Sequence, residues 1–508
     1  MNYTWWKKSL ALVLALAFVL AGTAAVAAEE DPLVIGQGGD APGLHTLMEV
    51  DIPAYERINL INEPLFFIDY DLTLEPNLAT DWEISDDALQ IDVELREGVE
   101  WHHGGEMTAE DVAYTFEWIL DEDNPAENRD LYEAIEEIEI VDDYNIVFHL
   151  DEPYTFLVNN MARVGIIPEE YHEEVGYEEF RQNPSGTGPY IHEEWADDDY
   201  HRLSANENYW GGEPNFAELE FRPIPEDSSR LLAFEGGEID MFEGGVVPDE
   251  VERLEADEDI EVHRVGGAGY DYIGFNNNVV TDQNLRLAIS YALNREAIVE
   301  HVMGGVGMPG ESNLTPDMAH YNEELDFVHY DPDIAEEYLD EVEEKPDQLR
   351  IFTNENPVRM QIAEILEYEL GEIGIDAQVE VEEWGAFLDR VYDTDDYEMF
   401  ILGWAGQVDP DRASYRQFHS EGSSNHVNYE NERMDELLEE GRAIDPDSEE
   451  SMEIYGEVQE ILNEEQPKMF VSYSEEIALV HDEYEGFELH PYPANNWLQL
   501  VDDVELAE

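Results

Sequence analysis

The sequence predicts an α/β protein of two or three domains, and three observations support this prediction. Residues 349–404 show a strand–helix–strand–helix–strand pattern. Residues 90–116 and 138–150 alternate strand and helix signals separately, as in a second α/β lobe. About 480 residues follow a leader segment, more than one ordinary core holds, and no repeat or low-complexity linker divides them. The domains are therefore expected to form by the chain crossing between lobes.

The first thirty residues are predicted to be an export signal. Two lysines precede an apolar run over residues 10–26, and small residues follow up to Ala28. A retained membrane anchor is the alternative, but an apolar run of about 17 residues is at the short limit for a bilayer span. The prediction is a signal peptide over residues 1–28, cleaved after Ala27 or Ala28, and a soluble exported protein.

Two helices and the unit over residues 349–404 are specified by local signals. Residues 284–303 carry an amphipathic stripe that ends at two glycines. Asp331 and Pro332 supply an N-cap and a first-turn proline for another helix. The unit is expected to hold strands at 349–353, 375–381 and 398–402, with helices at 357–370 and 384–392.

The strand ends of this unit predict a binding site. Strands joined through helices normally form a parallel sheet, and ligands bind beyond the carboxyl ends of its strands. Here those ends bring four side chains to one rim: Arg359, Trp384, Trp404 and Gln407. A guanidinium, two indoles and an amide suit an organic ligand with a negative end. The structural alternatives are that each tryptophan belongs to the core and that Arg359 is an ordinary residue at the start of a helix, without a role in binding.

Acidic residues are spread along the whole chain. The sequence has 125 acidic and 23 basic residues and a formal net charge of −102, a sign that excludes nucleic-acid binding. Hydrophobic residues make up 43% of the chain, enough for a core, so disorder is not the explanation. At molar salt the Debye length falls to about 3 Å and surface repulsion is screened. The composition predicts an acidic, halophilic protein that needs salt to fold. A dedicated cation-binding protein would not need acid on every surface.

No pattern in the sequence indicates catalysis, a metal or a cofactor. The chain has no cysteine, which excludes disulfides, thiolate metal sites and a lipid anchor on an N-terminal cysteine. The motifs of serine hydrolases, zinc proteases, nucleotide-binding loops and calcium loops are missing from the sequence. His102 and His103 are neighbours, and neighbours on a strand point to opposite faces, which argues against joint metal ligation. A binding protein is therefore expected, and a secreted hydrolase is the disfavoured alternative.

A series of motifs, in order along the mature chain, resembles family 5 of the solute-binding proteins that serve ATP-driven importers of peptides, dipeptides and nickel. The first landmark is Leu95-Arg96-Glu97-Gly98-Val99-Glu100-Trp101-His102, with His103 where Asp is usual. The others are Thr108–Val112, Gly186–Tyr190, Asn206 with Tyr209–Gly211, Gly274–Asn276, Leu285–Ala288, Ala292–Ile298, Gly403–Asp411 and Tyr429–Leu438.

The resemblance implies a type II periplasmic-binding-protein fold with two main lobes, an inserted extra domain and hinge closure. Lobe I would comprise residues 29–60, 186–272 and 483–508, the inserted α/β domain residues 61–185, and lobe II residues 273–482. The ligand would be enclosed between the lobes and handed to an ABC permease and its ATPase. A periplasmic or otherwise extracytoplasmic monomer is expected.

The resemblance also implies ligand-binding residues. In peptide-binding relatives an Asp shortly after the Gly-Trp pair holds the ligand's ammonium group. That position falls on Gln407 here, or Asp409 takes its place through a shorter loop. Arg359 matches an arginine that meets the ligand's carboxylate, and the two tryptophans, Trp384 and Trp404, flank side-chain pockets. The predicted set is completed by Tyr270, Asn276 and Gly403.

The leading expectation is therefore a protein that captures di- or oligopeptides for import. Loss of the ammonium-binding Asp would cost about 1.5–3 kcal/mol of ligand binding if nothing replaced it. The same fold and transport role with an oligosaccharide, opine or metal-chelate ligand is thus an alternative. Peptide sensing without transport is another.

Overall fold

The computed structural model describes residues 32–70, 72–246, 248–404, 407, 409–446, 448–501 and 504–506. The predicted signal peptide and its cleavage site lie outside these ranges. None of the helices within them is long and apolar enough to span a bilayer.

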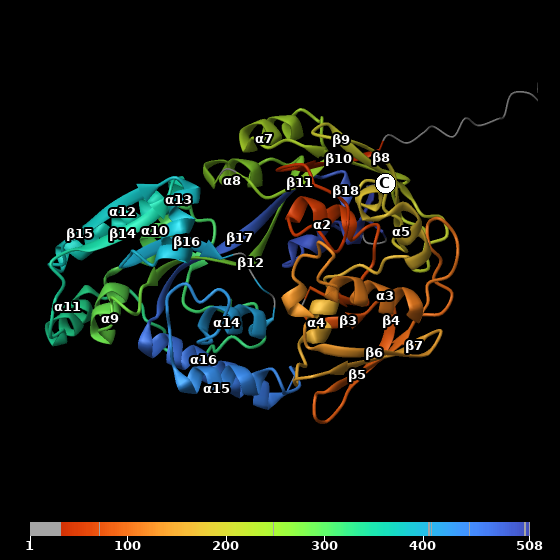
Figure 1. The fold of residues 1–508 in the computed structure, drawn as a ribbon. Coiled ribbons are helices and arrows are strands. Elements are labelled where there is room, and N and C mark those ends of the chain that lie inside the picture. Colours follow the sequence, from red (N-terminus) through yellow and green to blue (C-terminus); the bar gives the residue numbers. More distant parts are fainter. Residues whose placement is uncertain are drawn as a thin grey trace, which may run out of the picture.

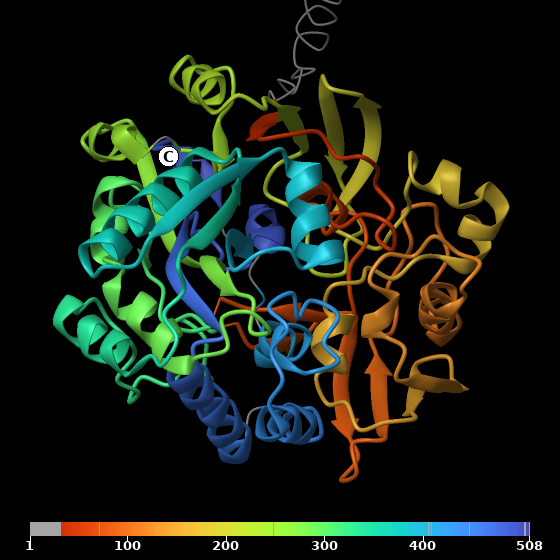
Figure 2. The same cartoon turned by 60° about the vertical axis from the view of Figure 1, so that its left-hand side comes forward.

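One continuous sheet runs through the molecule (Figures 1 and 2). From edge to edge its strands are β15 (Ala377–Glu382), β14 (Leu349–Asn354), β16 (Met399–Trp404), β12 (Ile260–Phe275), β17 (Lys468–His481), β11 (Met241–Glu243), β1 (Leu33–Gln37), β10 (Glu218–Pro223), β9 (Tyr200–Ala205) and β8 (Tyr190–Ala196), with β13 (Met308–Pro309) paired to β17.

Two long antiparallel strands, β12 and β17, connect the halves of this sheet. One half of β12 pairs with β16, and the other end of β17 pairs with β11. The β12–β17 register is interrupted between Gly266 and Tyr270. This irregular point lies where the strands pass from one half of the sheet to the other, so it is a natural place for the chain to bend.

Each half of the sheet has its own hydrophobic core. On the β14–β16 half, the core residues belong largely to the strands and to α9 (Gln283–Ala292), α11 (Pro332–Glu341) and α12 (Pro357–Glu372). On the β1–β10 half, the core includes Trp497 of η3 (Pro493–Leu500), in the C-terminal segment. Segments distant in sequence thus build one half together, as expected if the chain crosses between lobes.

Residues 61–185 contain a separate four-stranded sheet. Its order is β4 (Ala79–Ile84), β5 (Gln90–Leu95), β7 (Asn145–Leu150) and β6 (Ile135–Asp142), all antiparallel. α3 (Ala109–Leu120) starts at a capping box made by Thr108 and Asp111 and packs against β6 and β7. The strand–helix alternation predicted for this region is confirmed.

The remaining elements cover these sheets or connect them. They are α2 (Ile52–Ile58), β2 (Phe66–Ile68), β3 (Leu74–Pro76), η1 (Arg129–Leu131), α4 (Leu157–Met161), α5 (Glu169–Val175), α6 (Tyr177–Phe180), α7 (Asp227–Glu235), α8 (Pro248–Glu255), α10 (Arg295–His301), α13 (Trp384–Leu388), η2 (Asp389–Thr394), α14 (Pro410–Phe418), α15 (Glu432–Gly441), α16 (Glu449–Glu465), β18 (Tyr484–Glu485) and β19 (Glu505–Leu506).

The predicted unit over residues 349–404 is confirmed, with β14 parallel to both β15 and β16. The predicted helix over 284–303 is wrong in one respect, because it is two helices, α9 and α10. Leu293 is extended, and the Asn294 side chain accepts a hydrogen bond from the Ala297 backbone N–H at 2.9 Å. An asparagine that caps a new helix interrupts an apolar periodicity that looks continuous in sequence.

A buried carboxyl, Glu63, makes stability depend on pH. It accepts hydrogen bonds from Thr187 (2.7 Å), Tyr209 (2.8 Å) and Trp210 (3.0 Å), and burial raises its pKa to about 7. The folded chain therefore holds a proton that the unfolded chain releases near pH 4.5, and stability falls as pH rises from about 4.5 to 7. In Glu63→Gln we expect this fall to shrink by up to about 3 kcal/mol. Urea unfolding at pH 5 and pH 7.5 measures this change in unfolding free energy. An equal change in wild type and Glu63→Gln would contradict the prediction.

Candidate functional site

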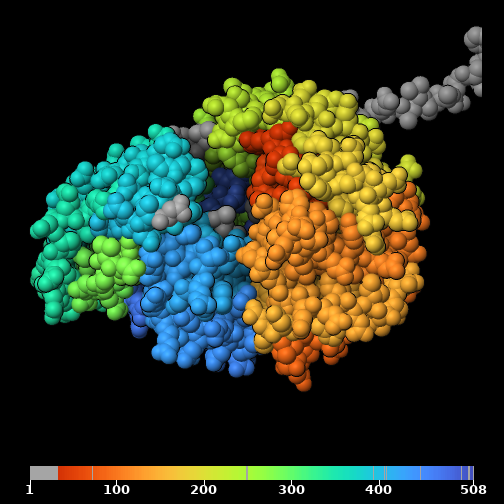
Figure 3. Space-filling model, viewed as in Figure 1, coloured from red at the N-terminus to blue at the C-terminus, as the bar shows by residue number. Residues whose placement is uncertain are grey.

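A hollow lies between the part of the chain with the four-stranded sheet and the part with α14, β16 and α13 (Figure 3). It contains two adjoining cavities, and Ile52 and Tyr492 belong to the walls of both. We call the first, of about 460 Å³, the tryptophan cavity; it is lined chiefly by Tyr270, Asp271, Arg359, Gly403, Trp404 and Ser472. We call the second, of about 190 Å³, the arginine cavity; it is lined chiefly by Tyr55, Tyr132, Arg163, Gln407, Arg412 and Tyr492.

The tryptophan cavity is built at the carboxyl end of β16, as the sequence predicts for a ligand crevice. Tyr270 on β12 lies directly opposite Trp404 on β16. The Trp404 ring is partly exposed to the cavity, whereas its Nε1 is buried and has no hydrogen-bond partner among the described residues. A buried donor without a partner is costly, so this N–H is well suited to a ligand carbonyl.

Arg359 also lines this cavity, but its charge is already paired. Its Nε donates to the Asp271 carboxylate at 2.9 Å, and both side chains are about four-fifths buried. Gly403 makes room for the pair, because a Cβ there would lie 2.2 Å from Arg359 Nη2 and 3.1 Å from Asp271 Oδ1. The pair presents no net charge to a ligand.

Replacing Gly403 by alanine is therefore expected to force Arg359 away from Asp271. The atom nearest to the added Cβ is the end of a flexible side chain, so the cost in unfolding free energy should be at the low end of overpacking, about 1 kcal/mol, while ligand affinity falls. Gly371→Ala is the matched control, because a Cβ at that helical position meets nothing within 4 Å and should be neutral or slightly stabilising. Denaturant unfolding and calorimetric titration of both variants test this. Equal effects of the two substitutions would contradict the steric argument.

A buried lysine supports the tryptophan cavity from behind. Lys468 Nζ donates to Gln417 Oε1 at 2.7 Å and lies over the rings of Tyr272 (4.5 Å) and Trp404 (5.8 Å). Gln417 in turn hydrogen-bonds the Tyr270 hydroxyl at 2.9 Å. Burial lowers the pKa of Lys468 to about 7. One hydrogen-bonded chain thus connects the lysine to the wall of the cavity.

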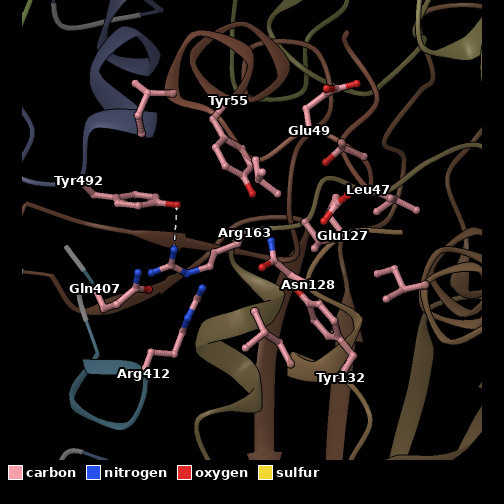
Figure 4. Close-up of a pocket in the computed structure, with 16 residues that line it drawn as sticks. Leu47, Glu49, Tyr55, Glu127, Asn128, Tyr132, Arg163, Gln407, Arg412 and Tyr492 are labelled. Carbon is pink, nitrogen blue, oxygen red and sulfur yellow. Dashed lines mark hydrogen bonds between the residues drawn. The ribbon is translucent and has the colours of Figure 1, made fainter. Parts of the chain in front are cut away.

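The arginine cavity brings three distant segments together (Figure 4). Arg163 follows α4, Arg412 belongs to α14, and Tyr492 precedes η3 in the C-terminal segment. Arg163 Nη1 donates to the Tyr492 hydroxyl at 3.3 Å. Figure 4 shows the two guanidinium groups and the Gln407 amide grouped on one side of the cavity. The cavity therefore gathers positive charge in a strongly acidic protein.

The other predicted site residues lie elsewhere. Trp384 is 46% exposed, stacks on Phe387, and lines neither cavity. Asp409 is buried as the N-cap of α14, where its carboxylate accepts from the Arg412 backbone N–H at 2.8 Å. Asn276 lies at the opposite end of β16, where its Nδ2 donates to the backbone carbonyl of Tyr397. The roles predicted for these three residues in ligand binding remain predictions.

Sequence reasoning missed Arg163 and Arg412. One signal could have pointed to Arg163, because it is the only charged residue within residues 153–168 in a chain with only 23 basic residues. Arg412 follows Asp-Pro-Asp and carries no comparable signal, since an arginine in the first turn of a helix is ordinary. Their meeting depends on contacts between segments about 250 residues apart.

Comparison with known proteins points to one family throughout. Residues 73–426 match the family model "Bacterial extracellular solute-binding proteins, family 5 Middle". The chain is 27% identical to the oligopeptide-binding protein AppA of Bacillus subtilis over 90% of this chain and 89% of AppA. It is also 27% identical to the dipeptide-binding protein of Escherichia coli over 96% and 97% of the two chains.

Solved structures agree with the sequence matches. AppA from B. subtilis in complex with a nonapeptide superposes with a TM-score of 0.76, at 26% identity over 94% of this chain and 99% of AppA. The ABC transporter substrate-binding protein CtaP from Listeria monocytogenes superposes with a TM-score of 0.85, at 26% identity over 94% of this chain and all of CtaP. The fold is thus that of periplasmic binding proteins with an additional domain, as the sequence predicts.

Proposed function

We propose that this chain, which belongs to family 5 of the bacterial extracellular solute-binding proteins, captures peptides outside the cytoplasm and delivers them to the permease of an ABC importer. The observation that carries the proposal is the tryptophan cavity at the carboxyl ends of the parallel strands. It offers an aromatic ring and an unpartnered indole N–H, and both suit a peptide backbone and its side chains. The two relatives named for binding oligopeptides and dipeptides support the same ligand class.

The proposed mechanism is hinge closure about β12 and β17. In this proposal the predicted lobes I and II would correspond to the two halves of the long sheet, and the irregular pairing between Gly266 and Tyr270 would act as the hinge between them. The structure agrees less closely with peptide-bound AppA than with CtaP at equal identity and coverage. In the proposal this difference reflects a wider angle between the lobes than in the peptide complex, and the structure would be an open form.

The proposal also includes the protein's oligomeric state, its export and its delivery of the ligand to the permease. The protein would act as a monomer after removal of a signal peptide, and it would release its ligand chemically unchanged. The permease would recognise the closed form, in which both lobes contact the ligand. The acidic surface would keep the protein folded and soluble in concentrated salt.

The test is to identify the ligand and the motion together. The protein is purified in molar salt, denatured to release what it carries, and the supernatant is analysed by mass spectrometry. We expect a set of short peptides, and their return to refolded protein should reduce the radius of gyration measured by small-angle X-ray scattering. A single sugar, opine or metal chelate would contradict the peptide assignment. An unchanged radius on binding would contradict hinge closure.

A further inference from the structure

Arg163 and Arg412 are exceptions among the arginines of the described chain. All the others form an ion pair with a carboxylate or donate from the guanidinium to a backbone carbonyl. Arg163 donates only to the Tyr492 hydroxyl, and the Arg412 guanidinium donates to no described residue. In a chain with 125 acidic residues, two arginines that form no ion pair with a described carboxylate call for a specific reason.

Three of their six guanidinium nitrogens are buried without a hydrogen-bond partner among the described residues. Arg412 is 8% exposed, and its Nε has no hydrogen-bond partner among the described residues. The Nε and Nη2 atoms of Arg163 are likewise buried without a hydrogen-bond partner among the described residues. Burying a guanidinium away from water without a partner is unfavourable unless an anion neutralises it and accepts its hydrogen bonds.

The carboxylates nearby leave this positive charge largely uncompensated. Glu49 is bound to Arg181, and Glu127 lies exposed at the edge of the arginine cavity. Asp409 is the buried carboxylate near both arginines, and one of its oxygens is committed to capping α14. Burial, and next to it the charge of Arg163, lowers the pKa of Arg412. For Arg163, burial is outweighed by Tyr492 and Asp409, which raise its pKa. One carboxylate against two guanidinium groups leaves room for one further negative charge.

We propose that Arg163 and Arg412 together bind one carboxylate of the ligand in the arginine cavity, while the rest of the ligand lies against Trp404 in the tryptophan cavity. The two cavities share the wall formed by Ile52 and Tyr492, so one elongated ligand can occupy both. Planar guanidinium groups suit a carboxylate because they can donate two parallel hydrogen bonds. Arg359 is not this anchor, because Asp271 already neutralises it.

This inference rests on the proposed function and narrows its ligand to peptides that present a carboxylate to the arginine cavity. The carboxylate belongs either to the peptide's C-terminus or to an acidic side chain. Three probes distinguish these sources: Ala-Ala-Ala, its C-terminal amide, and the C-terminal amide of Ala-Glu-Ala. Each is titrated calorimetrically into the full chain, refolded after release of its native ligand, in molar salt.

We expect the wild-type protein to bind Ala-Ala-Ala tenfold to a hundredfold more tightly than its amide, as the loss of a charge-assisted contact implies. If side-chain carboxylates serve as well, the Ala-Glu-Ala amide regains that affinity. In Arg412→Gln the preference for the carboxylate should fall below about threefold. Arg416→Gln is the matched control on the same helix, since its partner Asp130 lies outside both cavities, and it should keep the full preference.

Two outcomes overturn the inference while leaving peptide binding intact: wild-type protein that binds the amide as tightly as the acid, or Arg412→Gln that keeps the preference. If no peptide binds, glutarate is titrated instead. Glutarate binding that Arg412→Gln removes would support the anion site and contradict the peptide assignment, whereas no glutarate binding would overturn both.

A melting experiment separates this role from a structural one. Ligand-free Arg412→Gln should melt at or above the wild-type temperature, because the substitution removes an unpaired buried cation. A lower melting temperature would show that Arg412 serves the fold and would contradict the inference. Arg412→Lys, which keeps the charge but loses the planar fork, should retain an intermediate preference for the carboxylate.

Discussion

Lys468→Met is expected to be more stable than the wild-type protein at pH 6, by on the order of 3–5 kcal/mol, and to lose that advantage by about pH 10.5. The reason is that burial lowers the pKa of Lys468 from 10.5 to about 7. Between those values the unfolded chain binds a proton that the folded chain does not. Wild-type stability therefore rises with pH across this window and is lowest below it, whereas a methionine has nothing to titrate.

The interactions around Lys468 set the size of this effect. The Gln417 amide at 2.7 Å and the rings of Tyr272, Phe418 and Trp404 all favour the ammonium form, so they offset part of the burial cost. The pKa remains low because no carboxylate pairs with Lys468 in the described part of the chain.

Denaturant unfolding at pH 6 and pH 10, at one high salt concentration, measures the prediction for Lys468→Met. Lys345→Met is the control, because Lys345 is half exposed and its substitution should change stability by less than about 0.5 kcal/mol at either pH. A difference between Lys468→Met and wild type that is the same at both pH values would show that the amine is solvated or paired.

Trp404→Ala is expected to weaken peptide binding at least thirtyfold. The substitution removes an aromatic wall of the tryptophan cavity and an indole N–H that has no described protein partner. Loss of a buried aromatic anchor of this kind typically costs 2 kcal/mol or more, and each 1.4 kcal/mol is about tenfold in affinity. Titration of Ala-Ala-Ala or of the released native peptides measures the loss.

Two further variants divide this effect into its parts. Trp404→Phe keeps a ring but not the N–H, so the affinity it retains reports the contribution of the ring alone. Trp384→Ala should have a smaller effect than Trp404→Ala, since Trp384 is exposed and outside both cavities in this structure. An equal loss in Trp384→Ala would show that closure brings that indole onto the ligand, as predicted from the family resemblance. Unchanged binding in Trp404→Ala would overturn the assignment of the cavity.

Local signals in the sequence were enough to predict the elements of the fold and one wall of the site. Strand and helix periods, caps and glycines are local signals, so the unit over residues 349–404 could be read directly. Arg359, Trp384, Trp404 and Gln407 are predicted to share a rim because parallel strands end at the same edge of a sheet. Arg359 and Trp404 do line one cavity, whereas Trp384 lines neither and Gln407 lines the arginine cavity. Family motifs, also local, extended the prediction to the whole chain.

The charge of the site could not be predicted from the sequence, because it depends on contacts between distant segments. Arg359 looks like a free cation in sequence, but Asp271 on β12 neutralises it at 2.9 Å. Asp409 caps α14 with one carboxylate oxygen, and its role as the ammonium partner stays a prediction. In our proposal Arg163 and Arg412 supply the positive charge. The physical reason is that charge in a cavity depends on which side chains are buried without partners, and partners come from segments far apart along the chain.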